Sequence, residues 1–124
     1  MIALPTSGLL TLMKEASLAF WSKITCKIHL VNGSDHDTVE IKEKKIIIGR
    51  KAEHTISIND TSISRDHLQI TIEKDAVIIE DMGSSNGSFL NGVPLVGFQP
   101  TPYLEGQPII LGKCPINIFI ELPR

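Results

Sequence analysis

Short runs of apolar, mostly β-branched residues alternate with turn-forming residues along most of this chain. In residues 24–30 every second side chain is apolar, which is the pattern of a half-buried strand. Many short runs of this kind, separated by glycine, asparagine, serine and proline, predict an all-β sandwich or barrel. The expected strands are 24–30, 38–41, 45–48, 56–58, 67–72, 76–80, 88–90, 93–96, 108–111 and 116–122.

The connections between these runs carry their own signals. Asn91-Gly92 is a strong hairpin signal, because both residues tolerate the positive φ angles of a two-residue turn. Residues 32–37 are polar and predict a turn, whereas Pro100 and Pro102 predict an irregular connection before the last two strands.

The N-terminal residues differ from the rest, so we expect an extension at 1–22 and a β-domain at 23–124. Apolar residues between Gly8 and Trp21 would form a broad face on a helix. Three roles are open for this segment: a tail that covers one side of the domain, a helix for self-association or partner binding, or a disordered stretch.

Neither a membrane span nor a secretion signal is expected. Lys14 and Glu15 interrupt the apolar stretch, and no apolar run approaches the ~20 residues that a spanning helix needs. Nothing basic precedes Lys14, as a signal peptide would require. We therefore expect an intracellular protein, cytoplasmic or alternatively nuclear.

Charge and cysteine content argue against a nucleic-acid-binding site and against a metal site. With 12 basic and 14 acidic residues in 124, the net charge of −2 argues against a nucleic-acid partner, so any recognition of an anion has to be local. Cys26 and Cys114 lie far apart and lack the paired spacing of zinc ligands, so no metal site is expected. We expect two buried thiols in a reducing compartment, with a disulfide as the open alternative.

Three polar stretches, each next to an apolar run, contain the chemically active residues: 49–50, 64–67 and 84–87. Together they place arginine, hydroxyl, imidazole and amide groups on loops between strands. These groups suit an anion that is presented on a peptide. The natural target is a phosphorylated side chain, which carries about −1.5 to −2 charges and three strong acceptor oxygens.

The first two stretches supply the phosphate-binding groups. Arg50 offers a planar fork for two phosphate oxygens, and Gly49 lets the backbone bend where the strand ends. The Ser64 hydroxyl can donate to phosphate, and Arg65 can supply a second charge or contact the peptide. His67 can form a hydrogen bond within its turn. Taken singly, each residue also fits an ordinary turn or strand end.

The third stretch is a glycine-containing turn between two strands. Its functional version uses Ser85 and Asn86, and the amide of Asn86 can bind the main chain of a peptide, because it both donates and accepts. Gly87 permits a positive φ angle that supports the loop.

A catalytic function is not expected. Ser64, Asp66 and His67 are the residue types of a hydrolase triad, but neighbouring positions on an extended segment point to opposite faces. Glu80 and Asp81 are separated for the same reason. The chain lacks both the nucleophile-elbow and the P-loop motif, so we predict no enzyme activity and no cofactor.

In this order and spacing, residues 46–50, 58–67 and 80–92 strongly resemble the forkhead-associated (FHA) domain, and the similarity spans about 24–122. The resemblance implies an eleven-stranded β-sandwich that binds phosphothreonine peptides in signalling or regulated assembly, through loops at one end. Ser88 stands where the family usually has threonine, which should affect packing more than binding.

The resemblance also implies a role for each site residue. Arg50 and Ser64 contact the phosphate, and Arg65 adds to the phosphate or peptide contacts. Ser85 lies at the phosphothreonine, and Asn86 holds the peptide backbone. Gly49, His67 and Gly87 support the loops. The alternative is a phosphate-independent scaffold or oligomerisation module on the same fold.

Overall fold

The computed structural model describes residues 26–123, which form eleven strands in two sheets without a helix. The predicted all-β, eleven-stranded sandwich is therefore confirmed. The helix predicted between Gly8 and Trp21 lies outside the described residues. The strands are β1 (Cys26–Asn32), β2 (Asp35–Ile41), β3 (Lys45–Gly49), β4 (Ile56–Ser57), β5 (Leu68–Ile72), β6 (Val77–Asp81), β7 (Ser88–Leu90), β8 (Val93–Pro94), β9 (Thr101–Tyr103), β10 (Ile109–Leu111) and β11 (Asn117–Glu121).

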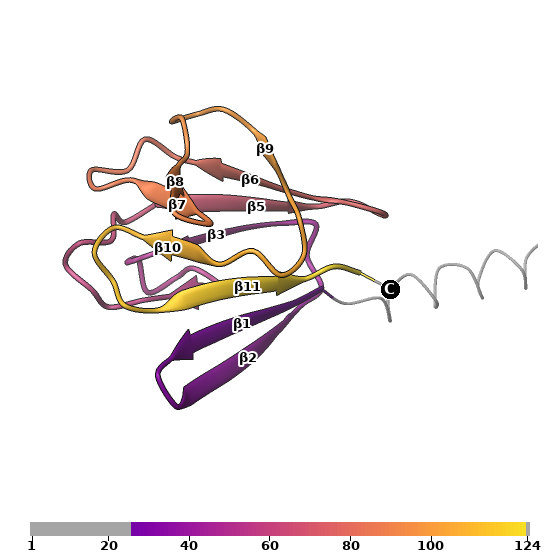
Figure 1. Cartoon of the computed structure of the whole chain (residues 1–124), viewed down its shortest axis with the longest axis horizontal. Helices are drawn as coiled ribbons and strands as arrows, with labels where there is room; N and C mark the ends of the chain where they lie inside the picture. The colour runs from indigo at the N-terminus through magenta and orange to yellow at the C-terminus, as the bar shows by residue number, and fades with distance from the viewer. Residues whose placement is uncertain (1–25, 124) are drawn as a thin grey trace, which may run out of the picture.

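One sheet has the order β2-β1-β11-β10-β7-β8, and the other has the order β4-β3-β5-β6-β9 (Figure 1). Of the pairings that define these sheets, only β3 with β4 is parallel among the described residues. The first and last strands are neighbours, with Ile28 opposite Ile120. This long-range pairing joins the N-terminal β1-β2 hairpin to the rest of the six-stranded sheet.

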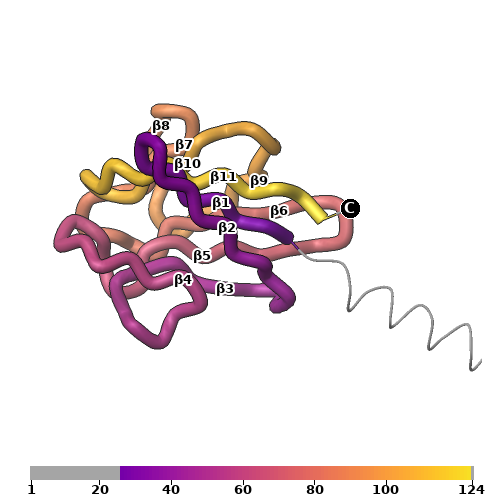
Figure 2. Tube along the Cα trace, turned by 90° about the horizontal axis from the view of Figure 1, so that it is seen from below, coloured from indigo at the N-terminus to yellow at the C-terminus, as the bar shows by residue number. Residues whose placement is uncertain are grey.

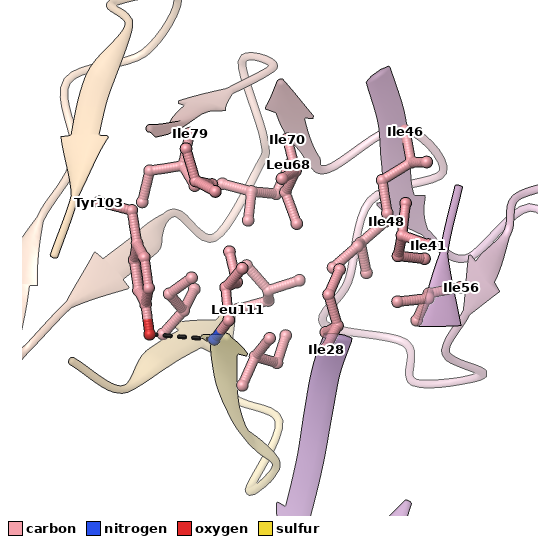
Figure 3. Close-up of a cluster of buried hydrophobic side chains, with 14 of the residues drawn as sticks. Ile28, Ile41, Ile46, Ile48, Ile56, Leu68, Ile70, Ile79, Tyr103 and Leu111 are labelled. Carbon is pink, nitrogen blue, oxygen red and sulfur yellow. Dashed lines mark hydrogen bonds between the residues drawn. The ribbon is translucent and has the colours of Figure 1, made fainter. Parts of the chain in front are cut away.

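The core lies between the two sheets and consists mainly of isoleucine (Figure 3). The alternation seen in the sequence explains it: Ile118 and Ile120 of β11 are buried, while Phe119 between them faces outward and is only partly buried. Tyr103 of β9 adds a polar bridge, since its buried hydroxyl donates to the Gln107 carbonyl (2.7 Å) and accepts from the Ile120 N–H (3.0 Å; dashed in Figure 3).

Two sequence predictions about connections differ from the structure. The irregular connection expected at Pro100 and Pro102 is wrong, because β9 occupies 101–103. This strand is tolerated because β9 is an edge strand: among residues 26–123 it pairs only with β6, so Pro102 need not donate to a second neighbour. The turn expected at 32–37 is also shorter, because β1 and β2 extend into it and leave only residues 33–34.

The hairpin predicted at Asn91-Gly92 is confirmed. These two residues join β7 to β8 with φ angles of 51° and 82°, as a two-residue turn with both central residues left-handed requires. Cys26 and Cys114 are both buried and free, in agreement with the expected thiols.

The loops that contain the three polar stretches gather at one end of the sandwich. They follow β3, precede β5 and follow β6, and the loop after β10 joins them at the left in Figures 1 and 2. The start of β1 and the end of β11 lie together at the opposite end, where Lys27 is in register with Glu121. No helix within residues 26–123 is long and apolar enough to cross a membrane.

Candidate functional site

Gly49 allows the first two loops to approach each other closely. A Cβ atom at this position would lie 2.0 Å from the Arg65 carbonyl oxygen, so no residue with a side chain fits there. The sequence interpretation assigned Gly49 to a backbone bend, but its φ is not left-handed, so the structural requirement is space. The Arg50 N–H then donates to the Ser64 carbonyl (3.0 Å) and holds the two loops side by side.

Arg50 is exposed, and its stem is fixed by one hydrogen bond. Nε donates to the Ile63 carbonyl (3.0 Å). This bond positions the side chain and does not use the two terminal guanidinium nitrogens. Arg65 is exposed on the neighbouring loop. Within residues 26–123 neither arginine forms an ion pair with a carboxylate, which leaves both charges available to an external anion.

His67 connects the second loop to the third. Its ring is completely buried, with Nδ1 accepting from the Ser64 N–H (3.0 Å) and Nε2 facing the Gly87 carbonyl at 2.8 Å. Because Nδ1 accepts, Nε2 carries the proton and donates it to Gly87. Both ring nitrogens are therefore used to hold loop backbone.

Further contacts place Ser64, Ser85 and Asn86 together. The Ser64 hydroxyl oxygen accepts from the Ser85 N–H (3.1 Å), which leaves its own hydrogen to donate outward. The exposed Asn86 side chain donates through Nδ2 to the Ser62 carbonyl (2.9 Å). The structure thus brings Arg50, Ser64, Arg65, Ser85 and Asn86 to one group of loops, with Gly49, His67 and Gly87 beneath them.

Asp81, which the sequence interpretation did not recognise as a site residue, anchors the third loop. Its carboxylate accepts from the Ser84 N–H (2.8 Å), the Ser84 hydroxyl (2.6 Å) and the Ser88 hydroxyl (2.5 Å). Burial opposes the charge, but these hydrogen bonds together outweigh burial and lower the pKa of Asp81. The spacing of aspartate and a serine three residues later is the available sequence signal.

We expect Asp81→Asn to reduce stability at pH 7 by about 1.5–3 kcal/mol, because hydrogen bonds to a charged group are lost. Because the pKa of Asp81 is lower in the folded than in the unfolded state, its ionised carboxylate contributes its full stability above the unfolded-state pKa of about 4. As the pH falls through the folded-state pKa, the carboxylate is protonated and this stability is lost. The variant should therefore lose less stability than wild type on acidification.

Urea unfolding between pH 7 and pH 3 measures this difference in stability, with Ser88→Ala as a companion variant that removes one hydrogen-bond donor to Asp81. Equal stabilities and equal acid slopes would contradict the assignment.

A second anchor stabilises the loops around Arg50 and Arg65. His54 Nε2 lies 2.7 Å from the Asp66 carboxylate and 2.9 Å from the Arg65 carbonyl, and Lys51 Nζ is 3.3 Å from the same carboxylate. The hydrogen bond from His54 is the main cause that lowers the pKa of Asp66. Asp66 is thus committed to His54 rather than to the His67 ring. No sequence signal joins these residues, because twelve positions separate them.

The fourth loop is attached through Ser62. Its hydroxyl donates to Asp60 (2.6 Å) and accepts from the Lys113 N–H (2.9 Å). The bonds from Ser62 also lower the pKa of Asp60. Gly112 permits this contact, since a Cβ there would lie 2.5 Å from the Ser62 carbonyl oxygen. Gly112 and Lys113 therefore lie against the loop that precedes β5.

Fold and loops define a β-sandwich that presents two arginines and several hydroxyl groups at one end. The family model for the FHA domain matches residues 46–112, more than half of the chain. The chain therefore belongs to the FHA domain family, as the sequence resemblance predicted, and FHA domains are binding modules.

Individual relatives agree with this assignment. FraH of Nostoc sp. is 40% identical over 62 residues, which are 50% of this chain and 22% of that protein. FhaA of Mycobacterium tuberculosis is 32% identical over 91 residues, or 73% of this chain and 16% of that protein. A solved chain from work on phosphothreonine-dependent FHA domain interactions is 28% identical, with a TM-score of 0.68 over 79% of this chain and 96% of its own. The chain thus spans less than a quarter of these curated relatives.

Proposed function

We propose that this domain binds phosphothreonine-containing peptides or proteins in signalling or regulated assembly. The observation that carries the proposal is the pair of arginines, Arg50 and Arg65, which lack a carboxylate partner within residues 26–123 and lie on loops held beside the Ser64 hydroxyl. The similarity to the chain from work on phosphothreonine-dependent interactions supports the same ligand.

We assign the phosphate contacts to Arg50 and Ser64, with Arg65 supplying a second charge to phosphate or peptide. Ser85 lies at the phosphothreonine, and Asn86 binds the peptide main chain. The support is geometric, because Arg50 is anchored through Nε and retains its two terminal nitrogens for a bidentate contact. The Ser64 hydroxyl keeps its hydrogen for donation.

We further propose that the domain is not an enzyme. The imidazole of His67 uses both nitrogens on backbone groups, so it cannot deprotonate the Ser64 hydroxyl, and Asp66 pairs with His54. The two free, buried cysteines support an intracellular, reducing environment. The division at residues 22 and 23 and self-association through residues 1–22 stay predictions.

The alternative, a phosphate-independent scaffold on the same fold, is less favoured, because the groups at the loop end suit an anion. A degenerate phosphothreonine peptide library and its unphosphorylated twin, titrated with the full chain, distinguish the two. We expect binding only to the phosphorylated library, with micromolar dissociation constants, or roughly −8 kcal/mol. Equal binding to both libraries, or binding to neither, would overturn the proposal.

A further inference from the structure

Two histidines face each other on the outer surface of the six-stranded sheet, outside the loop group described above. His29 lies on β1 and His36 on β2, with His29 Nδ1 3.0 Å from His36 Nε2 and ring centroids 5.1 Å apart. In register His29 lies opposite Thr38, so His36 is its diagonal neighbour on the same face. The recognition site uses neither residue.

Glu121 of β11 fixes the protonation of the His29 ring. Its carboxylate lies 3.0 Å from His29 Nε2 and can only accept, so Nε2 carries the proton and Nδ1 holds a lone pair toward His36. A carboxylate that binds the distal N–H of a histidine is the usual support of a metal-ligating imidazole, because it orients the ring and raises its basicity.

The spacing of the two nitrogens matches that of two ligands on one ion. With metal–nitrogen bonds of about 2.0–2.1 Å, ligand nitrogens lie about 2.9 Å apart at a right angle and about 3.3 Å apart in a tetrahedron. His29 Nδ1 and His36 Nε2 form a hydrogen bond at 3.0 Å, with His36 Nε2 as the donor because His29 Nδ1 holds the lone pair, so the two nitrogens already lie at a separation that a shared ion can span once it replaces this proton. The Thr38 hydroxyl oxygen lies 3.1 Å from His29 Nδ1 and provides a third possible ligand atom beside the two nitrogens.

We propose that His29 and His36 bind one divalent transition-metal ion of the zinc, nickel or copper class, with Glu121 as the positioning residue. Imidazole is a preferred ligand of these ions. His36 is exposed on the edge strand β2, so its ring can rotate and its proton can pass through water from Nε2 to Nδ1, which leaves a lone pair on Nε2 for the ion. Thr38 and water complete the coordination.

The surrounding charges favour a cation. Lys27 lies on the same outer face, but in register it is opposite both Glu40 and Glu121, so this group carries an excess of negative charge. The nearby thiol of Cys26 does not compete, because burial, together with Glu121 and Glu105, raises its pKa to about 11. The sequence before Cys26 contains neither histidine nor cysteine.

Calorimetric titration of the full chain with Zn²⁺ tests the proposal. We expect saturable binding of one equivalent, weakened at least ~10-fold in His36→Gln and about 10–100-fold in Glu121→Gln, which keeps the side-chain size but removes the charge. Asp37→Asn is the matched control, since it lies between His36 and Thr38 on the opposite face of β2 and should bind zinc like wild type.

Imidazole ¹H–¹⁵N spectra of the same samples locate the ion. We expect zinc to perturb the rings of His29 and His36 and to leave those of His54 and His67 unchanged. Unchanged backbone spectra of His36→Gln and Glu121→Gln in the absence of zinc establish that both variants are folded. Lack of saturable binding, equal affinity of His36→Gln and wild type, or perturbation confined to His54 would overturn the proposal.

Discussion

Arg50→Ala is expected to weaken binding of a phosphothreonine peptide at least ~10-fold, while leaving the domain folded. Arg50 is exposed, and its side chain makes one hydrogen bond, to the Ile63 carbonyl, so little packing is lost. A charge-assisted hydrogen bond contributes about 1.5–3 kcal/mol, and one decade of affinity corresponds to about 1.4 kcal/mol. Fluorescence anisotropy with a labelled phosphopeptide measures the loss.

Two further variants separate the fork of Arg50 from its charge. Arg50→Lys should restore binding only in part, because an ammonium group cannot make the bidentate contact. Lys45→Ala removes one exposed positive charge at the other end of β3 and should change the affinity little. If Arg50→Ala binds with wild-type affinity, the assigned phosphate contact is wrong. If Lys45→Ala loses as much affinity as Arg50→Ala, the effect of Arg50 is one of general charge and not of a specific contact.

Gly49→Ala is expected to be strongly destabilising, because the added Cβ would lie 2.0 Å from the Arg65 carbonyl oxygen and 2.7 Å from its carbonyl carbon. Backbone atoms cannot move aside as the end of a flexible side chain can, so the two loops have to separate. Overpacking costs typically about 1–3 kcal/mol, and we expect the upper end, about 3 kcal/mol, because the clash is with backbone atoms. The corresponding fall in Tm is roughly 12–24 °C for a domain of this size. Thermal unfolding followed by circular dichroism measures it.

Gly97→Ala is the matched control for this prediction. Its φ is not left-handed, and the nearest atom to an added Cβ is the Asp81 carboxylate oxygen at 3.9 Å, an ordinary van der Waals contact. The variant should unfold within about 0.5 kcal/mol of wild type. If Gly49→Ala proves as stable as Gly97→Ala, the close approach of the two loops is wrong.

The β-strands could be predicted to the extent that their residues carry a local pattern. Ile118 and Ile120 alternate with partly exposed residues, and that alternation alone defines β11. β9 lacks such a pattern because Pro102 argues against a strand, and only its position at the edge of the five-stranded sheet makes it acceptable. Edge position depends on the whole topology and cannot be read from three residues.

The candidate site shows the same division between local and long-range information. The loops that contain Arg50 and Ser64 could be located, because each has its own short motif. The pairing of His54 with Asp66 could not, because it depends on how separate loops meet in space. The role of Gly49 was only partly predicted, since the sequence shows a glycine but not the carbonyl that approaches it.

The loops and the chain ends of the described domain lie at opposite ends of the sandwich (Figure 1). Cys26 and Glu121, where the described strands begin and end, lie together at the end opposite the four loops (Figure 1). Both points are therefore distant from the loops at which we propose that a phosphopeptide binds. The domain can therefore be placed as a cassette within many different architectures, or in tandem arrays, without steric interference at its recognition surface.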